Sequence, residues 1–183
     1  NAAFYEQYKA GTLDIHEYTR FSVAPLAEHG VGPSDAAHRR FMDEIILPAM
    51  RPEAIDLVMR HQAAGDQVLI VTATNEFVTR PIAQAFGVSE LIAIELERDA
   101  AGNPTGGIRG TPSFREGKVA RVEQWLASRG LSWSDVTHSS FYSDSINDLP
   151  LLEAVTEPVA TNPDPRLSAI ATERGWRILN LFE

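Results

Sequence analysis

Three short groups of polar residues in this sequence have the types and spacing for chemistry. The first begins at Thr72, a hydroxyl directly after a mostly apolar run at 67–71. We expect this run to be a buried strand and 75–86 to be a helix. Thr72 and the backbone N–H groups of Ala73 and Thr74 would then form an anion site at a helix N-terminus. The alternative is that Thr72 or Thr74 only caps that helix.

The second group contains two carboxylates, Asp144 and Asp148, after an apolar strand expected near 139–143. Clustered carboxylate oxygens suit Mg²⁺, which keeps part of its water shell and shares oxygens of a substrate phosphate. Asn147 adds an amide that could orient a ligand. The alternative is that one aspartate caps a helix while the other is solvated.

The third group is a single residue, Lys118, at the start of a helix expected over 116–129. An ammonium group near a helix N-terminus gains nothing from the helix dipole, which favours anions there. Its position is better explained by contact with an anion. The alternative is an ordinary surface lysine.

The elements that must position these groups change in kind along the chain. Residues 1–50 show only helical periodicity, and two prolines indicate a connector at 47–52. Further helices are expected at 52–64, 147–155 and 165–175, further strands at 91–96, 158–161 and 176–181, and a hairpin or loop at 99–112. Alternating helices and strands predict an α/β fold with a doubly wound, mostly parallel Rossmann-like sheet. We therefore predict a helical cap at 1–50 and an α/β core at 51–183, with the ligand at the carboxyl ends of the strands.

Composition excludes several other classes of protein. Sixteen basic and 25 acidic residues give a net charge of −9, which disfavours nucleic-acid and membrane-surface partners. The sequence has no cysteine, and hence no disulfide, thiolate nucleophile or zinc–thiolate site. No apolar run is long enough to span a membrane, and the first residues lack a secretory signal. We expect a cytoplasmic protein, and the oligomeric state stays open.

Taken together and in order, the three groups resemble the haloacid dehalogenase superfamily of phosphohydrolases, in the branch of phosphoserine phosphatase. Its second motif is matched by Ile70-Val71-Thr72, its third by Lys118, and its fourth by Ser143-Asp144 through Asp148. The match covers 51–162, and the first fifty residues resemble the inserted cap of that branch. The resemblance implies a Mg²⁺-dependent phosphatase with a HAD-like fold.

The resemblance also implies a role for each matching residue. In the phosphate site, Thr72, the Ala73 N–H and the adjoining Thr74 would bind the phosphoryl group, whose charge Lys118 would neutralise. The sequence departs from the family pattern here, since Ala73-Thr74 replaces a glycine-rich pair.

In the metal site, the resemblance implies that Asp144 ligates Mg²⁺. Asn147 and Asp148 would position the metal shell and the ligand. Ser143 is a second departure from the family, because it stands where glycine is common.

The first motif of the family has no match. The family's nucleophile and general acid are two aspartates separated by one residue, whereas none of the ten aspartates here lies two positions from another. We therefore expect a further N-terminal strand that carries the nucleophile. It would lie between the strands that lead to Thr72 and Asp144, which should not pair directly and should stand roughly 9–10 Å apart.

Three functional hypotheses follow. The first is a Mg²⁺-dependent phosphomonoesterase that hydrolyses a small phosphorylated metabolite through an aspartyl-phosphate intermediate. The second is a non-catalytic binder or regulator that kept the phosphate pocket and lost the nucleophile. The third is a generic α/β domain without a phosphate site. Phosphoserine is one candidate substrate, and other amino-alcohol or sugar phosphates stay open.

Overall fold

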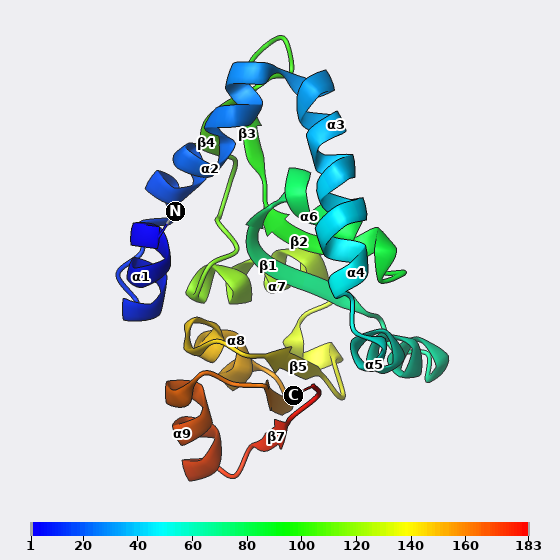
Figure 1. The fold of residues 1–183 in the computed structure, drawn as a ribbon. Helices are drawn as coiled ribbons and strands as arrows, with labels where there is room; N and C mark the ends of the chain where they lie inside the picture. The colour runs from blue at the N-terminus through cyan, green and yellow to red at the C-terminus, as the bar shows by residue number, and fades with distance from the viewer. Residues whose placement is uncertain (1, 183) are drawn as a thin grey trace. The chain divides into compact units, whose positions relative to one another are not determined.

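The computed structural model describes residues 2–182, which form two compact units (Figure 1). The first unit joins Asn1–Met50 to Val68–Pro112, and the second joins Arg51–Gln67 to Ser113–Glu183. The chain therefore passes between the units three times. Each unit has its own helices and its own strands.

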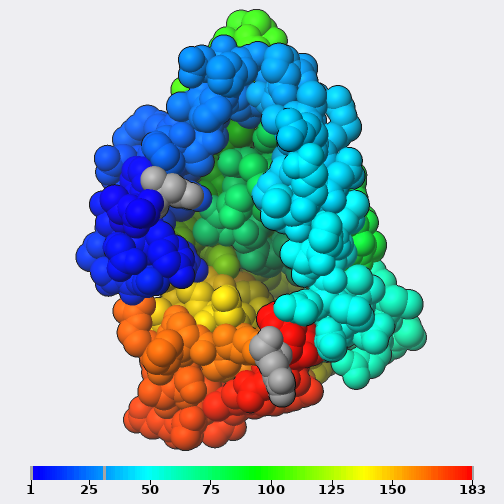
Figure 2. All heavy atoms as spheres, viewed as in Figure 1, coloured from blue at the N-terminus to red at the C-terminus, as the bar shows by residue number. Residues whose placement is uncertain are grey.

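The first unit combines N-terminal helices with four strands. Its helices are α1 (Ala2–Ala10), α2 (Ile15–His29), α3 (Val31–Phe41), a π-helical turn (Met42–Ile46), α4 (Leu47–Ala49) and α6 (Glu76–Ala85). Its strands are β1 (Leu69–Asn75) and β2 (Glu90–Ile94), which are parallel, and β3 (Leu96–Arg98) and β4 (Pro104–Ile108), which form an antiparallel hairpin. Helices α1 to α3, coloured blue to cyan, lie on the surface seen in Figure 2.

The core of the first unit lies between α2 and the hairpin. Val23, Leu26 and Leu96 form a buried cluster, and Phe77 packs against it. All regular structure in residues 2–49 is helical, as the periodicity predicts.

The predicted connector at 47–52 is too long. Leu47–Ala49 is helical, and only Met50 and Arg51 separate α4 from the next helix. Pro48 is accommodated because it lies in the first turn of α4, where a backbone N–H has no partner within the helix.

The second unit is an α/β structure in which helices alternate with parallel strands. Its helices are α5 (Pro52–Ala63), α7 (Glu116–Ala127), α8 (Leu149–Ala154) and α9 (Pro165–Glu173), with 3₁₀ turns η2 (Trp133–Asp135) and η3 (Ile146–Asp148). Its strands β5 (Ser140–Ser143), β6 (Glu157–Thr161) and β7 (Arg177–Leu179) are parallel and adjacent in that order. Leu152, Ala160, Leu167 and Ala171 form a fully buried cluster. The predicted α/β class with mostly parallel strands is confirmed.

Strand β1 is longer and less regular than the sequence predicts. It runs to Asn75 rather than ending at Val71, and the helix that follows is capped by Asn75, whose side chain accepts the Val78 N–H at 3.1 Å. The expectation that Thr72 lies directly at a helix N-terminus is therefore wrong. Neither Thr72 nor Thr74 caps the helix.

The extra length of β1 forms a bulge. Val71 is paired with Ile92, and the next paired residues are Asn75 and Ile94. Three residues of β1, Thr72 to Thr74, thus face one residue of β2. Bulges are common beside functional sites, because they re-aim side chains.

Strands β1 and β5 each have one unpaired edge within their own unit. Among residues 2–182, β1 pairs only with β2, and β5 pairs only with β6. This is the pairing expected if a further strand belongs beside them. That strand, its spacing and the division of the chain at residue 50 stay predictions.

Candidate functional site

A buried ion pair lies in the second unit. Lys118 Nζ is 2.6 Å from Asp148 Oδ1, and the two side chains are only 6% and 11% exposed. Lys118 lies in the first turn of α7, and α7 packs against α8, which follows Asp148 directly. A buried ammonium requires a charged partner. The alternative of a surface lysine is therefore wrong.

Ser143 completes the environment of the Asp148 carboxylate. The Ser143 hydroxyl donates a hydrogen bond of 2.7 Å to Oδ2 of Asp148, while Lys118 occupies Oδ1. The Ser145 N–H in turn donates to Ser143 Oγ at 3.2 Å. Both oxygens of Asp148 are thus engaged by protein groups, which indicates that Asp148 orients Lys118.

Asp144 has the opposite environment. It follows β5 directly and is exposed, and no other residue of 2–182 donates a hydrogen bond or ion pair to its carboxylate. Its backbone carbonyl accepts the Asp164 N–H at 2.7 Å, so the main chain is held while the carboxylate is open. Asp144 therefore has a carboxylate available for a cation.

The residues present fit part of a Mg²⁺ shell. Within the described part of the chain, no group of three or more histidine, aspartate or glutamate side chains could hold a metal ion. Mg²⁺ is commonly held by one or two carboxylates together with waters and substrate phosphate oxygens. Asp144 can supply one such ligand.

The turn after Asp144 is tightly hydrogen-bonded. Asn147 is buried, and its N–H donates to Ser145 Oγ at 3.2 Å. The Ile146 N–H donates to Oδ2 of Asp164 at 2.8 Å. In the sequence Asp164 directly precedes Pro165 and the helix expected at 165–175, a position that indicates only a helix cap. Its contact with this turn follows from the adjacency of β5 and β6, whose carboxyl ends meet at one edge of the sheet.

The remaining predicted phosphate ligands lie in the first unit. Thr72, Ala73 and Thr74 form the bulge of β1, and Thr72 Oγ1 accepts the Thr74 N–H at 3.1 Å. The second unit brings together Lys118 and the residues 143–148. That Thr72 converges with them on one phosphate stays a prediction.

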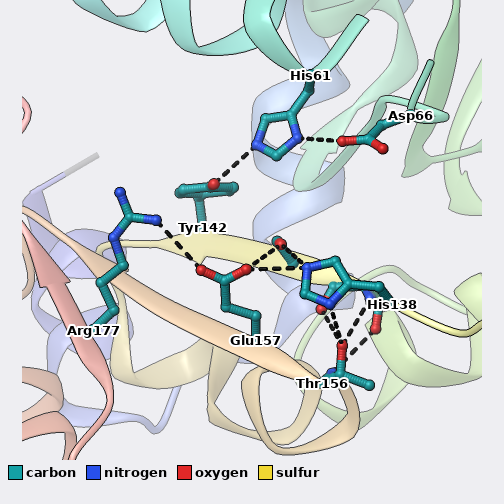
Figure 3. A network of polar contacts seen from close by, with 9 residues as sticks. His61, Asp66, His138, Tyr142, Thr156, Glu157 and Arg177 are labelled. Atoms are coloured by element: carbon teal, nitrogen blue, oxygen red, sulfur yellow. Dashed lines mark hydrogen bonds and ion pairs between the residues drawn. The ribbon is translucent and has the colours of Figure 1, made fainter. Parts of the chain in front are cut away.

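A second polar network anchors β5 on α5 (Figure 3). His61 Nδ1 is 2.7 Å from Oδ2 of Asp66, and its Nε2 is 2.9 Å from the Tyr142 hydroxyl. Burial raises the pKa of Tyr142 above its ordinary value. The phenol therefore keeps its proton, and the His61 ring bridges the Tyr142 hydroxyl and the Asp66 carboxylate.

Glu157 is the centre of the adjoining part of the network (Figure 3). Its carboxylate accepts from Ser140 at 2.9 Å and lies 3.1 Å from His138 and 3.3 Å from Arg177. The Ser140 hydrogen bond, followed by those from Arg177 and His138, lowers the pKa of Glu157 below 4.5. Its ionised form therefore stabilises the strands that carry the site.

We expect Glu157→Gln to lower the thermal midpoint at pH 7 by roughly 1–3 °C. Because the folded pKa is depressed, the stabilisation is present above pH 4.5 and is lost as the pH falls through the folded value. Thermal unfolding followed from pH 7 to pH 3 should show the two proteins converging. Glu173→Gln, an exposed change on α9, should track the wild type at every pH. A constant gap for Glu157→Gln would contradict the prediction.

The sequence matches a model of the haloacid dehalogenase-like hydrolase family over residues 2–153. It is 46% identical over 180 residues to a histidinol-phosphatase of Neisseria meningitidis serogroup C (strain 8013), covering 98% of this chain and 81% of that protein. It is 32% identical to a phosphoserine phosphatase of Mycobacterium tuberculosis, covering 93% of this chain and 54% of that protein. The chain thus spans most of the first relative and about half of the second.

Solved structures show the same fold. A protein of unknown function from Bordetella pertussis Tohama I is 51% identical with a TM-score of 0.93, covering 99% of this chain and 81% of that one. A phosphoserine phosphatase solved as a phospho-aspartyl intermediate analogue is 17% identical with a TM-score of 0.65, covering 100% and 79%. No helix in the described part of the chain is long and apolar enough to cross a membrane.

Proposed function

This chain belongs to the haloacid dehalogenase-like hydrolase family, and on that premise we propose that it is a Mg²⁺-dependent phosphatase of a small phosphorylated metabolite. The observation that supports the proposal is the contrast between two carboxylates four residues apart. Asp148 is buried on Lys118, whereas Asp144 is open. This arrangement offers one fixed cation and one free metal ligand.

Phosphoryl transfer depends mainly on positioning and on stabilising charge around the phosphate oxygens. Lys118 supplies positive charge in a buried setting, where it acts more strongly than in water. Asp148 fixes the direction of that ammonium. Mg²⁺, when bound at Asp144, would supply further charge neutralisation. In this proposal Thr72, Ala73 and Thr74 bind the phosphoryl group, and Asn147 orients the ligand.

The proposed nucleophile is an aspartate on a further strand outside this numbering. Its carboxylate would attack phosphorus as the P–O bond to the substrate alcohol breaks, and the second aspartate of the family's first motif would protonate the departing alcohol. Water would then hydrolyse the aspartyl phosphate to inorganic phosphate and the free aspartate. Unpaired edges on β1 and β5 support the presence of such a strand. We also propose a cytoplasmic location.

Histidinol phosphate is the first substrate to test, because the relative with 46% identity is named a histidinol-phosphatase. Phosphoserine is the second, from the 32% identical relative. Both are phosphate monoesters of a primary alcohol beside an amine. A cap at residues 1–50 would distinguish them.

The test is phosphate release by the full-length protein from a panel of amino-alcohol and sugar phosphates. We expect Mg²⁺-dependent turnover of histidinol phosphate above that of phosphoserine. Removal of the metal by EDTA should reduce activity to the background, and excess Mg²⁺ should restore it. The carboxylate of Asp144 is negative and cannot supply the positive charge that the metal places on the phosphate.

A non-catalytic phosphate binder is the second candidate. The observation that favours it is that no two aspartates of this sequence are separated by a single residue, as the two aspartates of the family's first motif are. Binding of a phosphorylated metabolite, measured by calorimetry, without turnover of any member of the panel would support it over the phosphatase.

A further inference from the structure

Asp164 joins the proposed metal site to the rest of the second unit. Building on the proposed function, we propose that Asp164 is a positioning residue that holds the loop of Asp144 for metal binding. It does so through its second carboxylate oxygen, which serves no purpose in capping α9.

The two oxygens of Asp164 have separate partners. Oδ1 accepts the N–H groups of Arg166 and Leu167, both at 2.9 Å, and caps α9. Oδ2 accepts the Ile146 N–H at 2.8 Å. A serine, threonine or asparagine could cap the helix equally well. Only a residue with two acceptors can cap the helix and hold the loop at once.

The contacts of Asp164 lie on the two peptide groups that follow the proposed ligand. Its own N–H donates to the carbonyl of Asp144 at 2.7 Å, and its Oδ2 accepts from Ile146, two residues further on. These two hydrogen bonds fix the two peptide groups directly after Asp144 without touching its carboxylate. The direction of the carboxylate is thereby restricted while its oxygens stay open.

Asp164 is itself held in place. Asn162, in the left-handed region at φ 43°, accepts the Leu181 N–H at 2.9 Å through Oδ1 and donates through Nδ2 to the Phe182 carbonyl at 2.6 Å. Its backbone N–H donates to Leu179 at 2.9 Å. The loop after β6 is therefore anchored on β7 and on the segment that follows it, which gives Asp164 a fixed base.

Asp14 provides a matched control elsewhere in the chain. Its Oδ1 accepts the N–H groups of His16 and Glu17 at 2.8 and 3.1 Å, which is the capping pattern of Asp164. Within residues 2–182, its side chain makes no contact equivalent to that of Asp164 with Ile146. Replacing each aspartate by asparagine separates the effect of a cap from the effect on the loop.

We expect Asp164→Asn in the full-length protein to raise the Mg²⁺ concentration for half-maximal activity about 10-fold. At saturating Mg²⁺, kcat should recover to within about threefold of the wild type, because the metal can draw the ligand back into place. Asp164→Ser, which keeps the cap and cannot reach Ile146, should behave in the same way. Asp14→Asn should leave the Mg²⁺ dependence unchanged.

Two measurements are independent of turnover. Mn²⁺ binding, followed by electron paramagnetic resonance, should weaken about 10-fold in Asp164→Asn and not in Asp14→Asn. Hydrogen exchange at the Ile146 amide, followed by NMR, should be slow in the wild type and faster in both Asp164 variants.

The outcomes separate the inference from the proposed function. Wild-type turnover together with unchanged Mg²⁺ dependence in both Asp164 variants would overturn the positioning role and leave the phosphatase intact. If the wild type shows no turnover, the proposed phosphatase activity is wrong, and Mn²⁺ binding decides the inference. Equal Mn²⁺ affinities of the wild type and Asp164→Asn would overturn the positioning role, and weaker binding by Asp164→Asn would support it. If neither Asp164 variant folds, rapid exchange of Ile146 in the wild type overturns the inference, and slow exchange supports it.

Discussion

Replacing Lys118 with alanine is expected to lower kcat/KM by roughly 10²-fold or more and to destabilise the fold by about 3 kcal/mol. The first effect follows because the ammonium would no longer stabilise charge on the transferring phosphoryl group. The second follows because Asp148, with a side chain only 11% exposed, would be left as a buried charge beside the Ser143 hydroxyl. Steady-state kinetics and urea unfolding of the same preparation measure both.

A double variant separates the two effects of Lys118. Lys118→Met with Asp148→Asn replaces the ion pair by neutral groups of similar size, so stability should return to within about 1 kcal/mol of the wild type. Activity should stay low because the cation is still absent. Recovery of both stability and kcat/KM in the double variant would show that Lys118 acts only in folding.

Asp144→Asn is expected to abolish Mg²⁺-dependent turnover with almost no loss of stability. An amide oxygen lacks the negative charge that attracts a hard cation. The Asp144 side chain is exposed and has no protein partner among residues 2–182, so the change should alter the free energy of unfolding by less than about 0.5 kcal/mol. Phosphate release across a range of Mg²⁺ concentrations, with thermal unfolding alongside, tests both expectations.

Two comparisons make the Asp144 result specific. Asp56 is also exposed and lies on α5, so Asp56→Asn removes the same charge from the same unit and should keep full activity. Excess Mg²⁺ should restore Asp164→Asn and should not restore Asp144→Asn. Near-normal turnover in Asp144→Asn would place the metal ligand elsewhere.

Much of the fold could be predicted because local signals coincide with element ends. The helix predicted over 52–64 is observed as Pro52–Ala63, and Gly65 at φ 87° supplies the left-handed residue that follows it. Gly130 at φ 70° does the same after α7. Glycine marks such positions in the sequence, since other residues adopt positive φ at a cost.

The end of β1 could not be predicted from the apolar pattern. That pattern stops at Val71, whereas the strand continues to Asn75 because Asn75 is paired with Ile94. Pairing of this kind is set by the neighbouring strand. A one-dimensional pattern contains no information about it.

The chemistry of the candidate site could be predicted only in part, because some of its contacts also depend on how distant elements pack. Residue types and positions indicate Lys118 and Asp144 as an anion contact and a metal ligand. The ion pair of Lys118 with Asp148 joins residues thirty positions apart and depends on the packing of α7 against α8. The second contact of Asp164 depends on the adjacency of β5 and β6. Both are tertiary effects.

The alternation of side chains along β1 depends on whether its bulge adds an even or an odd number of residues. From Val71 to Asn75 the strand advances four residues while its partner advances two, from Ile92 to Ile94. The surplus is two, an even number, so the alternation of side chains between the faces stays in step across the bulge. An odd surplus would exchange the faces and move Asn75 away from the position where it caps α6. The segment from Thr72 to Thr74 therefore amounts to a two-residue insertion that adds two threonine hydroxyl groups to a half-buried strand and keeps Asn75 paired with Ile94.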